Sequence, residues 1–170
     1  MTATVTRHSV IGPPNTASGR HGLSPVALFG SPHGFIFERY TCTGMRRTVS
    51  TEDAPAAVGA YSQAVATDDL VFTAGQIPLT PEDDLLDGAG MDVQTEQALE
   101  NLTAVLEASG ASTDDVLKVT VYMTDIGRFD TMDTVYETFF EGDPPARSAV
   151  GVAELPKGVD IEVEAIATTG

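Results

Sequence analysis

Two segments near the C-terminal end of the chain carry side chains that could act on a small acid. Arg147 lies on a short extended run, residues 144–150, and Glu162 and Glu164 lie on an alternating run that ends at residue 167. A guanidinium binds a carboxylate through paired hydrogen bonds, and a carboxylate can take a proton from water. If the two runs form neighbouring strands, they predict a site for small organic acids. The alternative is a solvated face with Arg147 in a surface salt bridge.

The last strand has two faces of opposite character, because side chains alternate along a strand. One face carries Val159, Ile161, Val163 and Ala165, and the other carries Asp160, Glu162 and Glu164. We expect the apolar face to lie on helices. The acidic face is expected to meet sister subunits, which predicts an oligomer with polar pockets between chains.

The remaining residue types exclude several classes of chemistry. Residues 45–170 contain no His, Cys or Trp, which excludes Ser-His-Asp and thiolate nucleophiles and nearly every zinc site. No GxxxxGK[ST] or GxGxxG run is present, so phosphate binding has no support in the sequence. Arg, Glu, Asp, Tyr and backbone groups remain. They can bind a carboxylate and orient a water molecule, and no metal or cofactor is expected.

The charge of the chain is strongly acidic and unevenly distributed. Its formal net charge is -16; residues 1–44, with three Arg against one Glu, contribute +2, which leaves -18 on residues 45–170. Nucleic acid and anionic membranes need a basic surface, so neither is an expected partner. An acidic excess with two Lys, Lys118 and Lys157, resembles proteins of salt-loving cells. An acidic protein of ordinary salt is the alternative.

The first 44 residues differ from the rest of the chain. They have Gly, Pro and Ser punctuation without a lasting period, which predicts little ordered structure. Their three histidines, 13 and 12 residues apart, do not favour a metal site. Met45 resembles a natural start, which makes residues 1–44 a possible mis-assigned extension of a domain at 45–170. The single cysteine, Cys42, fits a reducing compartment, and we expect the cytoplasm.

Eight elements are predicted from residue 45 onward, and they must position the candidate residues. Strands are expected over residues 47–50, 61–66, 70–74, 116–123, 144–150 and 159–167, and helices over 92–109 and 127–140. The helices have apolar stripes at Leu99, Leu102, Val105 and Leu106, and at Phe129, Met132, Tyr136, Phe139 and Phe140. The order β-β-β-α-β-α-β-β predicts an α+β fold: one sheet with two helices on one face.

Five sequence blocks in this order resemble the RidA/YjgF family of reactive intermediate deaminases. They are 54–64 (APAAVGAYSQA), 73–78 (TAGQIP), 136–140 (YETFF), 145–148 (PARS) and 161–167 (IEVEAIA). The resemblance covers essentially residues 45–170. It implies a chorismate-mutase-like fold and a homotrimer with clefts between subunits. It also implies hydrolysis of 2-imino or enamino acids, such as 2-iminobutanoate, 2-iminopropanoate and 2-aminoacrylate, to 2-keto acids and ammonia.

The resemblance also implies roles for individual residues. Arg147 would bind the substrate carboxylate, and Glu162 would hold the attacking water, with its pKa lowered by a nearby Arg. Tyr61 would form a wall of the cleft. Backbone groups of Gly75 and Ala149 would contact the substrate.

Two positions depart from the family pattern. Asp133 replaces a frequent Asn, and it would bring a negative charge toward the substrate if it faces the cleft. Ala149 replaces a frequent Cys, so only a backbone role is expected there. Tyr122 and Tyr136 are predicted to pack. Two alternatives stay open: a non-catalytic, small-acid-binding or chaperone-like trimer, and a deaminase for another electrophilic nitrogen compound.

Overall fold

The computed structural model describes residues 45–140 and 142–169 of the 170-residue chain. The predicted N-terminal extension, with its histidines and Cys42, lies outside the described residues. Its expected lack of order and the start at Met45 therefore stay predictions. Within the described ranges, no helix has both the length and the apolar character that a bilayer crossing requires.

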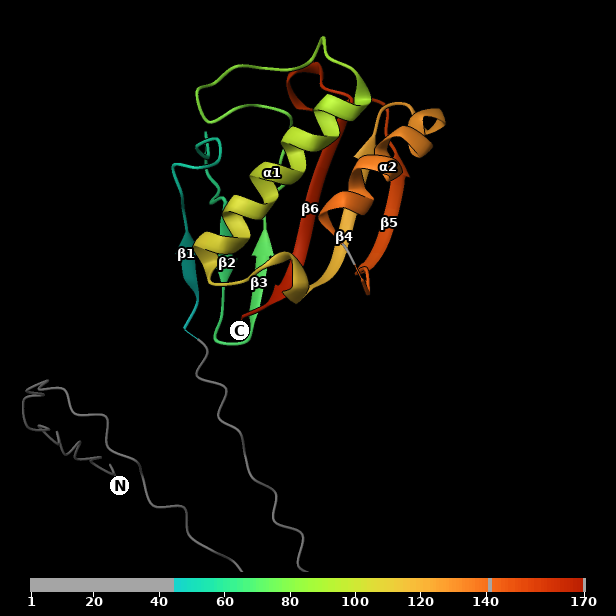
Figure 1. Ribbon diagram of the computed structural model, residues 1–170. Coiled ribbons are helices and arrows are strands. Elements are labelled where there is room, and N and C mark those ends of the chain that lie inside the picture. Colours follow the sequence, from blue (N-terminus) through green and yellow to red (C-terminus); the bar gives the residue numbers. More distant parts are fainter. Residues whose placement is uncertain (1–44, 141, 170) are drawn as a thin grey trace, which may run out of the picture. The chain divides into compact units, whose positions relative to one another are not determined.

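Six strands form one mixed sheet in the order β1-β2-β3-β6-β4-β5 (Figure 1). They are β1 (Arg47–Val49), β2 (Ala64–Ala66), β3 (Leu70–Thr73), β4 (Val116–Met123), β5 (Ala146–Gly151) and β6 (Ile161–Thr168). Neighbouring strands are antiparallel except β4 and β5, which run parallel. The predicted antiparallel meander of the first three strands is confirmed.

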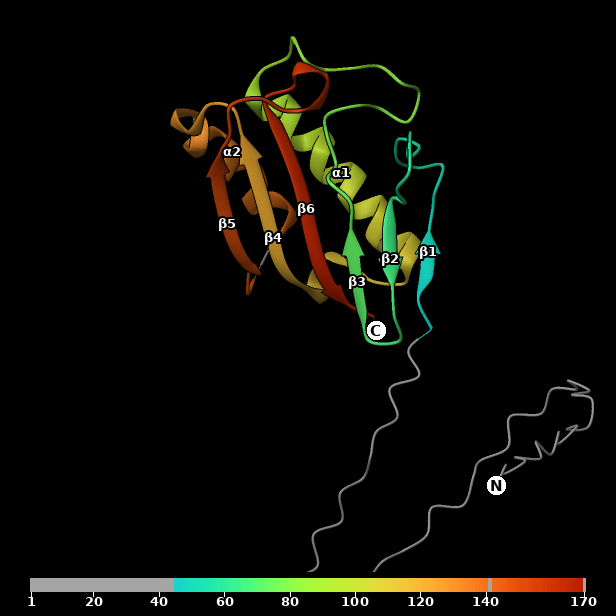
Figure 2. The same ribbon diagram turned by 180° about the vertical axis from the view of Figure 1, so that it is seen from behind.

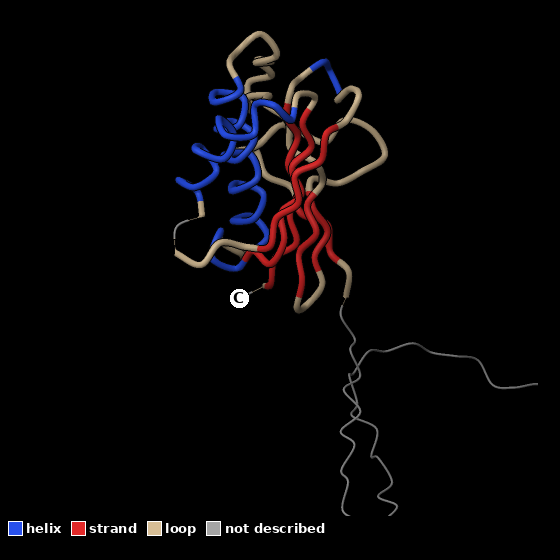
Figure 3. The backbone as a smooth tube through the Cα atoms, turned by 90° about the vertical axis from the view of Figure 1, so that its right-hand side faces the viewer, coloured by secondary structure: helices blue, strands red, loops and turns tan. Residues whose placement is uncertain are grey.

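Two helices, α1 (Met91–Ser109) and α2 (Phe129–Phe139), lie together on one side of the sheet (Figure 3). This arrangement confirms the predicted α+β class with both helices on one face. Helix α2 begins later than predicted because residues 126–128 form a 3-10 turn. The Asp125 carboxylate caps that turn by accepting a hydrogen bond from Gly127 N at 2.9 Å.

The apolar stripe of α1 forms the centre of the core. Leu99, Leu102, Val105 and Leu106, the four residues of the predicted stripe, are at most 1% exposed. Burying each of these side chains contributes about 1.5–3 kcal/mol relative to leaving it exposed. Gly110 then ends the helix in the left-handed conformation, with a φ of 87° that favours glycine.

Strand β6 separates the core from the open face of the sheet, as its alternation predicts. Ile161, Val163 and Ala165 are buried in the core, whereas Glu162 and Glu164 are only half-buried. Figure 2 shows this open face, which no helix of the described residues covers. The contact with sister subunits that was expected for this face stays a prediction.

Two expectations about strands are wrong. Arg147 and Glu162 are not on neighbouring strands, because β4 lies between β5 and β6. Helix α2 returns the chain to the start of β4, so β5 pairs in parallel with β4, and β6 takes the other side of β4. Strand β2 is also shorter than predicted, because Tyr61 and Ser62 precede it in irregular backbone.

Candidate active site

Arg147 lies in a pocket between α2 and the edge strand β5. The pocket, here called the Arg147 pocket, has a volume of about 420 Å³ and is lined by Asp133, Tyr136, Glu137, Phe140, Gly142, Pro144, Pro145 and Arg147. Arg147 Nη2 lies 2.6 Å from Asp133 Oδ1 in a salt bridge. Its Cζ lies 4.3 Å from the centroid of the Tyr136 ring and 5.2 Å from that of Phe129. An ion pair and two cation–π contacts therefore hold this guanidinium over α2.

Helix α2 presents these partners because Phe129, Asp133 and Tyr136 are four and three residues apart, which places them on one helix face. Tyr136 is buried, and its ring stacks on Phe140 at a centroid distance of 4.5 Å. Burial, opposed by Arg147, raises the pKa of Tyr136 to about 12, so its hydroxyl stays protonated. The sequence pattern predicts Tyr136 and Phe129 as packing residues only. Their spacing from Asp133 indicates a shared helix face, but only the tertiary structure shows that this face contacts Arg147.

Glu162 lies in a second pocket, on the open face. This Glu162 pocket, of about 620 Å³, is lined by Pro55, Ala56, Val58, Tyr61, Gln63, Ala74, Gly75, Gln76, Ile77, Leu79, Pro156, Lys157 and Glu162. The carboxylate of Glu162 lies directly against Gly75, where an added Cβ would overlap Glu162 Oε1. Gly75 is therefore needed for the close approach of this side chain to the backbone.

An extra residue after β3 shapes this approach. Phe72 pairs with Ile166 on β6, and Gln76 pairs with Val163 on β6. The chain therefore advances four residues from 72 to 76 while β6 advances only three. Such a bulge bends the backbone. The Thr73 hydroxyl accepts a hydrogen bond from the backbone N–H of Ala165 at 2.9 Å inside the bulge. The bulge brings the segment that contains Gly75 over β6, beside Glu162.

Burial is the main cause that raises the pKa of Glu162, and the neighbouring carboxylate of Glu164 raises it further. The expectation that a nearby Arg lowers this pKa is wrong for the single chain. Arg147 pairs with Asp133 instead. A carboxylate with a raised pKa is a better proton acceptor than an ordinary surface Glu once it is ionised.

The loop before β2 fixes Tyr61 at the rim of the Glu162 pocket. The buried Gln63 side chain donates to the Pro55 carbonyl at 2.8 Å and accepts from Thr51 N at 2.7 Å, which ties this loop to the end of β1. The Tyr61 hydroxyl accepts a hydrogen bond from Val58 N at 3.4 Å. The Tyr61 side chain is 56% exposed, so its ring is free to contact a ligand or another chain.

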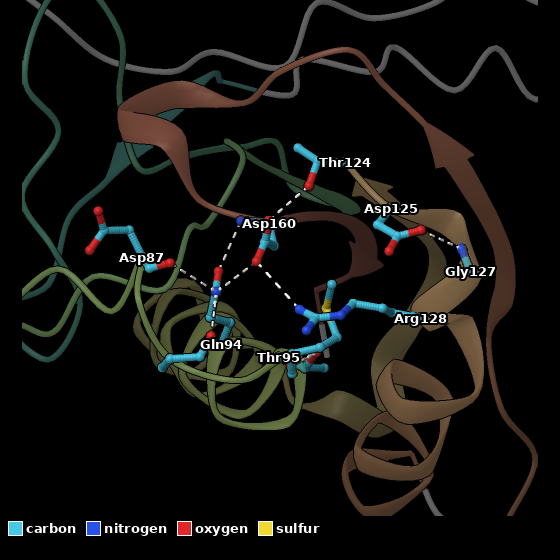
Figure 4. Close-up of polar contacts among 10 residues, drawn as sticks. Asp87, Gln94, Thr95, Thr124, Asp125, Gly127, Arg128 and Asp160 are labelled. Carbon is cyan, nitrogen blue, oxygen red and sulfur yellow. Dashed lines mark hydrogen bonds and ion pairs between the residues drawn. The ribbon is translucent and has the colours of Figure 1, made fainter.

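A polar network holds the entry to β6, two residues before Glu162 (Figure 4). The buried Gln94 side chain of α1 donates to Asp160 Oδ2 at 3.1 Å and accepts from Asp160 N at 2.9 Å. Thr124 donates to Asp160 Oδ1 at 2.9 Å, and Arg128 lies 3.6 Å from Oδ2. These contacts fix the start of β6 to α1 and to the end of β4. They therefore set the position of Glu162 along the strand direction.

The structure brings the predicted site residues together in two groups, not one. Tyr61, Gly75 and Glu162 share the Glu162 pocket, and Asp133 and Arg147 share the Arg147 pocket. Arg147 pairs with the fully buried Val119, and so faces the helices, whereas Glu162 faces the open side. Ala149, two residues after Arg147 on β5, lines neither pocket. One chain alone therefore cannot place both charges on one small molecule.

Among residues 45–140 and 142–169, no group of three or more His, Cys, Asp or Glu side chains is placed to hold a metal ion. The acids of the two pockets also lie apart from one another. The ionisable groups and hydroxyls that line the two pockets are one guanidinium, the ammonium of Lys157, carboxylates and tyrosine hydroxyls.

Residues 51–169 match the family model described as Endoribonuclease L-PSP, which spans most of the chain. The chain belongs to the RidA/YjgF family. A RidA/YjgF relative from Rattus norvegicus, named 2-iminobutanoate/2-iminopropanoate deaminase, is 46% identical over 126 residues, covering 74% of this chain and 92% of the relative. The protein of the same name from Salmonella typhimurium is 44% identical, covering 72% and 98%.

Solved structures of RidA/YjgF proteins share the fold. The structure of E. coli TdcF with bound serine superposes with a TM-score of 0.69 at 41% identity, covering 73% of this chain and 99% of that one. The YjgF gene product of E. coli gives 0.69 at 42% identity, with 73% and 99% covered. The fold predicted from the RidA/YjgF resemblance is therefore confirmed.

Proposed function

We propose that this protein is a 2-iminobutanoate/2-iminopropanoate deaminase, which hydrolyses reactive 2-imino acids to 2-keto acids and ammonia. Relatives that carry this name at 42 to 46% identity support the proposal. The observation that carries it is the position of Glu162, whose carboxylate lies against the backbone of Gly75 in a pocket walled by Tyr61. This arrangement suits a base that holds one water molecule over a small, planar substrate.

In the proposed reaction, Arg147 binds the substrate carboxylate through paired, charge-assisted hydrogen bonds. Glu162 accepts a proton from water while the water oxygen attacks the carbon of the C=N bond. The proton taken by Glu162 and the remaining hydroxyl proton pass to the nitrogen, the C–N bond breaks, and ammonia leaves while the oxygen forms the C=O bond of the keto acid. Tyr61 orients the substrate, and backbone groups of Gly75 and Ala149 contact it. Imines hydrolyse readily in water, so positioning supplies most of the acceleration.

The proposed site is built from two copies of the chain. Arg147 and Glu162 face opposite sides of one sheet, so the α2–β5 edge of one copy must lie on the open face of the next. Contact between two different surfaces is heterologous, and it closes into a ring when the rotation between copies is a whole fraction of a turn. A homotrimer is the ring that the family resemblance implies. Phe72 and Val150, 45% and 40% exposed, supply apolar area for such a contact.

A second candidate function is a trimer that binds small acids without turnover. The salt bridge between Arg147 and Asp133 is the observation behind this candidate, because a guanidinium that already has an anionic partner orients a substrate carboxylate less firmly for turnover. The same salt bridge also leaves open the alternative that the protein is a deaminase for a different electrophilic nitrogen compound.

Two further proposals rest on composition alone. The single cysteine supports a cytoplasmic location. The net charge of -16 supports a protein adapted to high salt, because at molar salt the Debye length falls to roughly 3 Å and the acidic groups barely repel one another.

The decisive experiment follows keto-acid release from 2-aminoacrylate that a serine dehydratase generates in the same cuvette. The purified protein, in buffer and in high salt, is expected to speed pyruvate release well beyond the rate in buffer alone. Sedimentation in high salt is expected to give the mass of three chains. A rate equal to that of buffer would refute the deaminase, and binding of the acids without turnover would favour the second candidate.

Replacing Gly75 by alanine is expected to lower kcat/KM about 100-fold, because the added methyl group displaces the Glu162 carboxylate. The free energy of unfolding should fall by only about 1–2 kcal/mol, since the overlap is with a movable side chain. Gly88→Ala is the matched control, because a Cβ there meets nothing within 4 Å. Full activity of Gly75→Ala would mean that the position of Glu162 is irrelevant to turnover.

The pH profile of kcat/KM, which reports the free enzyme, should show an acid limb above 4.5, the usual pKa of a Glu side chain. Only ionised Glu162 can accept the proton, and its raised pKa means that the ionised fraction is lost at a higher pH than for an exposed Glu. Steady-state rates from pH 4 to 8 test this, and a limb at or below 4.5 would contradict it.

A further inference from the structure

The salt bridge between Arg147 and Asp133 is half-open to the Arg147 pocket. The two side chains are 21% and 32% exposed, and both line the pocket. A guanidinium has five N–H donors, and Asp133 engages one nitrogen of it. Within the described ranges, Asp133 is the one carboxylate within 4.0 Å of this guanidinium. The remaining donors can bind a second anion, which would then lie a few ångströms from the Asp133 carboxylate.

The charges of this pair sum to zero, and Glu137, which also lines the pocket, adds a negative charge. The pocket therefore gives little net attraction to a molecule whose only charge is a carboxylate. Such an anion gains its hydrogen bonds to Arg147 but is repelled by Asp133, and a half-buried pocket screens that repulsion less than bulk water does. A zwitterion behaves differently, because its positive nitrogen offsets the repulsion. A lone Arg147 would favour the anion, because the guanidinium repels the positive nitrogen of the zwitterion.

The proposed reaction converts a zwitterionic substrate into an anionic product. The protonated imine is a zwitterion with an iminium nitrogen and a carboxylate, and it reacts with one water molecule to give the keto-acid anion and one ammonium ion. The water oxygen forms the new C=O bond while the C–N bond breaks, and the nitrogen takes both water protons. The organic product therefore carries one negative charge and no positive charge.

We propose that Asp133 is a specificity-determining residue that makes the Arg147 pocket select the zwitterionic imino acid over the keto-acid anion. The reaction in this inference is that of the proposed function. The preference for one kind of acid, in contrast, is a property of the Arg147 pocket that can be measured without turnover. Asp133 repels the product carboxylate bound at Arg147, so it lowers the affinity for the product and speeds its release. The negative charge of Glu162 would act in the same direction if a neighbouring copy supplies it.

The test compares wild type with Asp133→Asn, and with Asp130→Asn as a control on an exposed acid of the same helix. Calorimetry measures 2-oxobutanoate, a monoanion, and 2-aminobutanoate, a stable zwitterion with the same carbon skeleton. Asp133→Asn is expected to bind 2-oxobutanoate about tenfold more tightly, with a change below about threefold for 2-aminobutanoate. Product inhibition of turnover should strengthen by the same tenfold, while Asp130→Asn matches wild type.

Equal gains for both acids, no gain for either, or no measurable binding to any variant would overturn the proposal. If Asp133→Asn fails to fold by circular dichroism, Asp133→Ser removes the same charge with a smaller side chain. The proposed function and the proposed role of Asp133 can fail separately. A wild type without deaminase activity but with the expected switch in binding refutes the proposed function alone, whereas an active enzyme without the switch refutes the role of Asp133 alone.

Discussion

The Arg147→Ala variant is expected to lose about 10²–10³-fold in kcat/KM for 2-aminoacrylate. Removing one partner of a hydrogen-bonded, desolvated charge pair costs about 2–5 kcal/mol, and each 1.4 kcal/mol is a factor of ten. A second effect has the same direction, because Asp133 loses its partner and then repels the substrate carboxylate. Steady-state kinetics with the dehydratase-coupled assay measures the loss, and sedimentation of the variant beside wild type shows whether the assembly is unchanged.

Two companion variants separate binding from structure. Arg147→Lys keeps the charge but not the planar fork, so it should retain part of the activity. The double variant Arg147→Ala with Asp133→Asn removes the unpaired acid, and it should recover roughly tenfold without reaching wild type. Wild-type kinetics in the double variant would mean that Arg147 serves only to neutralise Asp133.

The Glu162→Gln variant is expected to lower kcat about 10²–10³-fold, the size of a general-base contribution, with little change in the affinity for 2-oxobutanoate. Glutamine keeps the shape of the side chain against Gly75 but cannot take a proton. The folded-state pKa of Glu162 is raised, so its ionisation at neutral pH opposes folding. The free energy of unfolding at pH 7 should therefore stay unchanged or rise slightly.

Glu154→Gln, at an exposed position before β6, is the matched control for the loss of one carboxylate. It should keep wild-type turnover. Urea unfolding at pH 7 and single-turnover kinetics decide whether Glu162 acts as a general base or only supports the structure. A parallel fall of stability and activity in Glu162→Gln would assign Glu162 to structure and leave the water without its base.

Most of the fold was predictable from the chain because local patterns repeat over each element. The stripe from Leu99 to Leu106 predicted the buried face of α1, and Gly110 predicted its end. The alternation in β6 predicted which side chains enter the core. Irregular backbone was harder to predict. Tyr61 is a strand-forming residue, but the Gln63 side chain binds the preceding loop, and β2 starts only at residue 64.

The sequence by itself determined the residue types of the site. With no His or Cys after residue 44, it left Arg147, Glu162 and tyrosine to carry any chemistry. Only the tertiary structure decided how they are grouped, because strand pairing depends on contacts between residues distant in the chain. Insertion of β4 keeps β5 and β6 apart, and the register of the strands sets the two faces. Arg147 pairs with the buried Val119 and so lies against α2 and its Asp133, whereas Glu162 lies beside Gly75 on the open face. No local period encodes that separation.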